Sequence, residues 1–137
     1  MWFTERDSLG GWFKPMSNQN LQDSFKCAFS GVVETLKSER NFKIHVIASI
    51  GAMGLGIILR ISVIEFVLVM IAITMVLATE ILNTAIEIVV DLYTGERVHP
   101  LAKAAKDAAA GAVLITTVNA VGVGVAIFST RLIGLIM

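Results

Sequence analysis

The sequence contains the segment Glu80-Ile81-Leu82-Asn83-Thr84-Ala85-Ile86-Glu87-Ile88-Val89-Val90-Asp91, directly after an uncharged run over residues 66–79. At the 100° per residue of an α-helix, four polar side chains fall within a sector of roughly 80°: Glu80, Asn83, Glu87 and Asp91. Three carboxylates on one face of an otherwise apolar helix repel each other unless a cation is present. The pattern therefore favours an active or transport site over a stripe that only holds helices together.

The composition is that of a membrane protein. Of the 137 residues, 55% are hydrophobic and 16% are charged, whereas soluble domains contain about 25% charged residues. The net charge is zero, and no basic tract suggests nucleic-acid binding. The single cysteine, Cys27, excludes an intrachain disulfide and a multi-cysteine metal site. These features predict one small all-α integral membrane unit.

The first part of the chain is expected to lie outside the bilayer. We expect residues 1–19 to be a flexible extension and residues 20–137 to form the membrane domain. Within that domain, residues 20–37 place apolar side chains on one helical face: Leu21, Phe25, Ala28, Phe29, Val32, Val33 and Leu36. The segment is too polar to span a bilayer and predicts an amphipathic surface helix. A helix packed only on protein is the alternative.

Three spans are expected, over residues of about 42–60, 62–92 and 101–130, because about 20 residues cross the hydrocarbon. The second is roughly 45 Å long, so its last turns protrude, and Glu80 lies about 16 Å deeper than Asp91. Arg131 marks the exit of the third span. Small residues in that span suggest close packing against a neighbouring helix: Ala104, Ala108, Gly111 and Ala112.

The basic residues set the expected orientation. Most of them precede the first span or lie between the second and third, and only Arg60 and Arg131 fall on the opposite side. The positive-inside rule then places the N-terminus and the second loop in the cytoplasm. It also places six charged side chains on one cytoplasmic rim, where nucleotides are available: Glu39, Glu87, Asp91, Lys103, Lys106 and Asp107.

This rim could support phosphoryl transfer. Carboxylates from three elements, Glu39, Glu87 and Asp107, suit Mg²⁺, which binds one or two carboxylates plus substrate phosphates. Lys103 and Lys106 are candidate phosphate partners, and the deeper Glu80 is a candidate general base for a lipid hydroxyl. A small ion or proton translocator could use the same acids, and a membrane scaffold subunit is a third possibility.

The motifs resemble the prokaryotic diacylglycerol kinase and undecaprenol kinase family. The resemblance rests on Glu80 to Asp91, on His99-Pro-Leu-Ala-Lys103-Ala-Ala-Lys106-Asp107-Ala-Ala-Ala-Gly111, and on the turn Ser38-Glu39-Arg40-Asn41-Phe42. It covers residues from about 20 to 130. It implies an ATP- and Mg²⁺-dependent lipid kinase of a bacterial inner membrane, acting as a homotrimer of three-span protomers with active sites shared between neighbours.

The resemblance also implies roles for single residues. Glu80 corresponds to the family's base and Asn83 to a residue that orients the base or the lipid hydroxyl. Glu39 and Glu87 correspond to the metal-binding acids. The remaining matches would hold the nucleotide: Asp91, Lys106 and Asp107, with Lys103 beside them.

Two positions depart from the proteobacterial branch, which has an arginine and an acid where this chain has Lys43 and His45. The sequence His-Pro-Leu-Ala-Lys at residues 99–103 is more similar to the motif of the branch from Gram-positive bacteria. The preferred lipid of that branch resembles undecaprenol more than diacylglycerol. We therefore expect undecaprenol as the leading substrate and diacylglycerol as the second.

Overall fold

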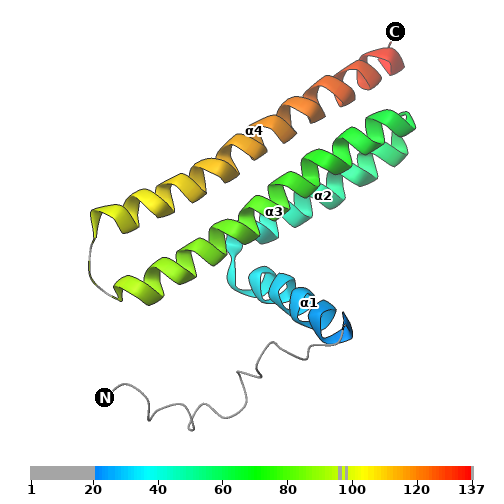
Figure 1. Cartoon of the computed structure of the whole chain (residues 1–137). Helices are drawn as coiled ribbons and strands as arrows, with labels where there is room; N and C mark the ends of the chain where they lie inside the picture. Colours follow the sequence, from blue (N-terminus) through cyan, green and yellow to red (C-terminus); the bar gives the residue numbers. More distant parts are fainter. Residues whose placement is uncertain (1–20, 96, 98, 137) are drawn as a thin grey trace, which may run out of the picture. The chain divides into compact units, whose positions relative to one another are not determined.

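A computed structural model describes residues 21–95, 97 and 99–136. The regular structure of this described part is helical, in the order α1 (Leu21–Ser38), α2 (Arg40–Ile58), α3 (Val63–Thr94) and α4 (Pro100–Ile136) (Figure 1). As the sequence predicts, α2, α3 and α4 are each long and apolar enough to cross a membrane. The extension expected over residues 1–19 lies outside the described residues.

The chain divides into two compact units, the first ending at Val33 and the second beginning at Glu34. The described part of the first unit is the beginning of α1. The large apolar side chains of this part are exposed: Leu21, Phe25 and Phe29. An exposed apolar face of this kind is what a helix on a membrane surface requires.

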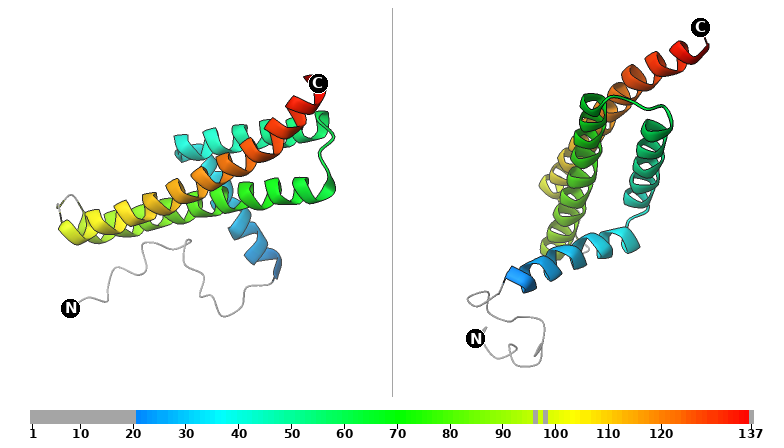
Figure 2. Two further views of the ribbon diagram at one scale, coloured as in Figure 1. Left: turned by 90° about the horizontal axis from the view of Figure 1, so that it is seen from above. Right: turned by 90° about the vertical axis from the view of Figure 1, so that its right-hand side faces the viewer.

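In the second unit, α3 packs against both α2 and α4, and these two helices run alongside it (Figure 2). The buried residues of α3 recur every three or four positions and so form one stripe along the helix: Val69, Ala72, Val76, Glu80 and Thr84. The core therefore follows a single face of α3. Glu80 belongs to that face and interrupts its apolar series.

The turn between α2 and α3 is built by two adjacent motifs. Arg60 has a left-handed φ of 51°, and the N–H of Ile61 donates to the carbonyl of Gly56 over 3.1 Å, which closes a Schellman motif. A Cβ on Gly56 would lie 2.9 Å from Ile61 Cδ1, so the end of the Ile61 side chain would have to shift to admit a larger residue. Ser62 then begins α3 with a capping box to Glu65.

The ends of α3 and α4 that meet at the second loop are also capped. Gly95 ends α3 with a φ of 58° and donates its N–H to the carbonyl of Asp91 over 2.9 Å. His99 precedes α4, and its Nδ1 accepts the N–H of Leu101 over 3.2 Å. Both devices satisfy backbone groups that a helix end leaves open.

At its other end, α4 continues to Ile136, past the exit that the sequence analysis placed at Arg131. The expected end of the third span near residue 130 stays a prediction, because a helix can continue beyond the part that crosses the bilayer. Arg131 itself forms an ion pair with Glu65 of α3.

Candidate active site

Glu80 is the buried acid of the second unit, with 3% of its surface exposed. Its backbone carbonyl accepts a hydrogen bond from Thr84 Oγ1 over 3.0 Å, one helical turn further on. Among the described residues, no side chain forms an ion pair or hydrogen bond with the Glu80 carboxylate. A carboxylate on so little exposed a residue, with no partner among the described side chains, is costly to stability, which favours a functional reason for its presence.

Three ionisable side chains influence the charge of the Glu80 carboxylate: His45, Glu39 and Glu87. Glu39 occupies the N-cap position of α2, yet its side chain makes no capping hydrogen bond, so its carboxylate is available. Helix α3 supplies both Glu87 and Glu80. The fold therefore gathers Glu39, Glu80 and Glu87, here named the acid group, from the start of α2 and one face of α3.

Asn83 is fixed beside the acid group. Its Nδ2 donates to Glu87 Oε1 over 3.1 Å, which orients the amide. Its Oδ1 is buried and accepts no hydrogen bond from the described residues. A buried acceptor without a donor is uncommon in native structures. The Nδ2 of Asn83 thus contacts the acid group, and its Oδ1 is able to accept a hydrogen bond from a ligand.

The remaining candidates form two exposed ion pairs, here named the outer ion pairs. Lys106 Nζ lies 2.5 Å from Asp91 Oδ1 and joins α4 to α3. Lys103 pairs with Asp107 within α4. The two carboxylates are 61% and 62% exposed, so solvent screens both pairs and each adds little to stability. The sequence analysis grouped these residues with Glu39 and Glu87, and in the structure the members of this rim differ in exposure, with a partly buried acid group and exposed ion pairs.

Two members of the acid group have the oxygen donors that a magnesium ion prefers. Within the described part of the chain, no three Asp, Glu, His or Cys side chains converge closely enough to enclose a metal ion. Mg²⁺ usually takes only one or two protein carboxylates together with substrate phosphates. Glu39, with a carboxylate free of capping, and Glu87 fit that donor set.

Sequence reasoning missed several polar contacts. His45 was noted only as a departure from one branch, although it acts on Glu80, and no spacing rule could have shown this. The pair Glu65–Arg131 was also missed, because it joins residues 66 positions apart. The capping box was detectable, since Ser62-Val-Ile-Glu65 matches its pattern directly before an apolar run.

Comparisons with known proteins show the family of the chain. The family model of prokaryotic diacylglycerol kinases matches residues 26–128. The chain is 44% identical over 127 residues to the undecaprenol kinase of Bacillus subtilis (strain 168), covering 93% of this chain and 95% of that protein. It is 41% identical over 105 residues to a diacylglycerol kinase of Synechocystis sp., covering 77% of this chain and 60% of that protein. Both relatives are kinases, so ion translocation is not favoured.

Proposed function

The chain belongs to the prokaryotic diacylglycerol kinase family and is a lipid kinase, and from this premise we propose that it phosphorylates undecaprenol, with diacylglycerol as the second candidate substrate. The observation that carries the proposal is the buried Glu80 carboxylate beside Glu39 and Glu87. The choice of lipid is supported by the greater identity and coverage of the undecaprenol kinase relative.

In the proposed reaction, the Glu80 carboxylate takes the proton of the lipid hydroxyl. The alcohol oxygen forms a bond to the γ-phosphorus of ATP, the bond between that phosphorus and the bridging oxygen breaks, and ADP leaves. Asn83 holds Glu87 through its Nδ2, and its free Oδ1 can accept a hydrogen bond from a donor other than the lipid hydroxyl, whose one proton goes to Glu80. General base catalysis of this kind contributes about 10²–10⁴ in rate.

Glu39 and Glu87 would hold Mg²⁺, which when bound neutralises charge on the phosphates. The outer ion pairs would hold the nucleotide. Lys106 is half-buried and presents its ammonium between α3 and α4, where it can exchange Asp91 for a phosphate oxygen. Lys103 and Asp107 extend the same side of α4. Phosphoryl transfer depends mainly on such positioning and charge neutralisation.

We also propose that the protein is a homotrimer with shared active sites. Supporting this, one face of α3 carries a shallow groove that no described residue covers, lined by Val67, Met70, Ile71, Thr74, Met75 and Ala78. Chemical crosslinking in micelles followed by electrophoresis tests the trimer, and a ladder that stops at two copies would contradict it.

The N-terminus and the active site are proposed to face the cytoplasm, with α1 on the membrane surface. Cys27 is exposed on α1 and is the single cysteine of the chain. A membrane-impermeant maleimide should therefore label Cys27 in inside-out vesicles and leave it unlabelled in right-side-out vesicles. Labelling from the opposite side would reverse the proposed orientation.

The function is tested with purified protein in lipid-containing micelles supplied with ATP and Mg²⁺. Undecaprenol and diacylglycerol are offered in parallel, and phosphate transfer to each is measured. We expect preferential labelling of undecaprenol, and no labelling by Glu80→Gln protein that unfolds at the same temperature as the wild type or higher. Failure of folded wild-type protein to label either lipid would overturn the proposed function.

A further inference from the structure

Lys43 and His45, the two residues that depart from the pattern of the proteobacterial branch, make different contacts in the structure. Lys43 Nζ donates to the backbone carbonyl of Lys37 over 2.8 Å and so satisfies an open carbonyl in the last turn of α1. The backbone carbonyl of His45 accepts a hydrogen bond from Ser49 Oγ over 2.7 Å, but the imidazole forms no hydrogen bond with any described residue. Lys43 thus has a structural contact, and the ring of His45 does not.

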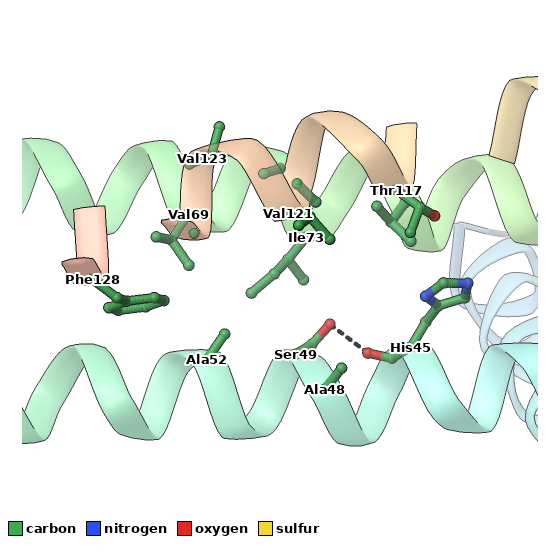
Figure 3. A pocket seen from close by; sticks show the side chains of 14 residues that line it. His45, Ala48, Ser49, Ala52, Val69, Ile73, Thr117, Val121, Val123 and Phe128 are labelled. Carbon is green, nitrogen blue, oxygen red and sulfur yellow. Dashed lines mark hydrogen bonds between the residues drawn. The ribbon is translucent and has the colours of Figure 1, made fainter. Parts of the chain in front are cut away.

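His45 lines a cavity of about 220 Å³ between α2, α3 and α4. Figure 3 shows His45 and Thr117 toward one end of this cavity and Phe128 toward the other. The walls are mainly apolar, with Val69 and Val76 supplied by the buried stripe of α3. An apolar cavity of about 150 Å³ stays dry and binds benzene, so this cavity can hold an apolar group of at least that size.

The end of the cavity at His45 contains polar side-chain groups that have no hydrogen-bond partner in the described structure. Thr117 Oγ1 is buried there without a hydrogen-bond partner in the described structure. Glu80 lies one helical turn beyond Val76 on the same buried face of α3. A ligand that fills the cavity with an apolar chain would bring its polar end to His45, Thr117 and Glu80.

The relation between His45 and Glu80 fits a hydroxyl group. His45 is one of the ionisable side chains that influence the charge of the Glu80 carboxylate, and yet no hydrogen bond among the described residues joins the two side chains. An alcohol placed between them could accept the N–H of the imidazole and donate its proton to the carboxylate, which satisfies both groups at once. Neither Glu39 nor Glu87 can supply the donor that the alcohol oxygen needs, because carboxylates only accept.

We propose that His45 is a substrate-binding residue that holds the lipid hydroxyl against Glu80, with the apolar segment next to that hydroxyl lying in the cavity between α2, α3 and α4. This inference rests on the proposed lipid kinase function. It assigns the imidazole a contact with the alcohol oxygen, and it assigns recognition of the first part of the lipid chain to residues of one protomer.

The test compares His45→Ala with the matched control Lys43→Ala in full-length protein, using undecaprenol, diacylglycerol and ATP in lipid micelles. His45→Ala should lower kcat/KM for the lipid roughly tenfold, the loss of about one hydrogen bond, and leave the KM for ATP unchanged. Added imidazole, or the donor in His45→Gln, should restore part of the lost activity. Lys43→Ala should retain wild-type kcat/KM for the lipid.

A second variant tests the cavity without touching the polar groups. Ala52→Leu adds apolar volume at the cavity wall and should raise the KM for the lipid, with the KM for ATP unchanged. Wild-type lipid kinetics in both His45→Ala and Ala52→Leu would overturn the inference. So would a loss in His45→Ala that neither imidazole nor glutamine restores. If the wild type labels neither lipid, the proposed function itself fails, which is a distinguishable result.

Discussion

Two groups of charges in the second unit are paired in opposite ways. Near the start of α3, here named the closed end, Glu65 pairs with Arg131 and accepts the N–H of Ser62 over 2.7 Å, while Ser62 Oγ accepts the N–H of Glu65 over 3.3 Å. In the acid group, no described cation pairs with Glu39, Glu80 or Glu87. The closed end has its partners within the described chain, whereas the acid group has no cation there.

This difference separates structural from functional charge in one molecule. Charges that pair with each other, such as Glu65 and Arg131, contribute to stability and leave no group free for a ligand. Acids without a cation, such as those of the acid group, are retained at a cost to stability. Substitutions in the two groups should therefore affect different quantities: activity at the acid group, and stability at the Glu65–Arg131 pair. The following predictions test that separation, in order of decreasing effect.

The largest effect in this series should come from moving the base. Glu80→Asp keeps the charge but withdraws the carboxylate by one methylene, and a misplacement of about 1 Å can cost 10²-fold in rate. We expect kcat to fall about 100-fold at saturating lipid and ATP. The thermal unfolding midpoint should stay close to that of the wild type, and a kcat within twofold of the wild type would remove Glu80 from its role.

A smaller effect is expected at the acid that begins α2. Glu39→Gln removes one carboxylate but keeps the shape of the side chain, so the Mg²⁺ concentration for half-maximal activity should rise roughly tenfold or more. This is measured by titrating Mg²⁺ at fixed ATP and lipid. Glu34→Gln, an exposed acid on α1, serves as the control, and an unchanged Mg²⁺ requirement in Glu39→Gln would argue against a metal role.

The outer ion pairs should matter less. Lys106→Met removes the cation that contacts Asp91 and, in our proposal, a phosphate oxygen. An exposed contact between two charges is worth at most about 1 kcal/mol. Loss of the contact between Lys106 and the phosphate should therefore raise the KM for ATP no more than about fivefold. The effect should shrink as ionic strength increases. A rise in the KM for the lipid instead of ATP would place Lys106 at a different substrate.

The smallest effect on activity is expected at the closed end. Arg131→Met leaves Glu65 without its cation, so the thermal unfolding midpoint should fall by a few degrees. Phosphate transfer per folded molecule should be unchanged. If Arg131→Met lowered kcat without lowering stability, the two groups would be coupled and the proposed separation would be wrong.

Much of the fold followed from periodicity. The three apolar helices and the single polar face of residues 80–91 are local properties, because a 3.6-residue period fixes which side chains share a face. The spacing of Glu80 and Asp91 along that face also follows from helix geometry, but the burial of Glu80 and the exposure of Asp91 depend on neighbouring helices. The family motifs predict which acids belong together, and the family comparison confirmed the lipid kinase class.

Contacts between helices were not predictable in the same way. The sequence analysis expected close packing at Ala104, Ala108, Gly111 and Ala112, but within the described chain the buried alanine of that region is Ala109, so packing of the other small residues against a second copy stays a prediction. Small residues recur on more than one face of α4, and which of these faces is buried depends on where α3 lies. The same reason hid Glu65–Arg131 and the approach of His45 to Glu80, since each depends on a second helix.

The most direct test of the central claim compares Glu80→Gln with Glu65→Gln, two identical changes on the same helix, one in its middle and one in its first turn. Phosphate transfer to undecaprenol and the thermal unfolding midpoint are measured for both proteins in the same micelles. The account predicts that Glu80→Gln is inactive and at least as stable as the wild type, while Glu65→Gln is active and less stable. Equal activity in the two variants would contradict it.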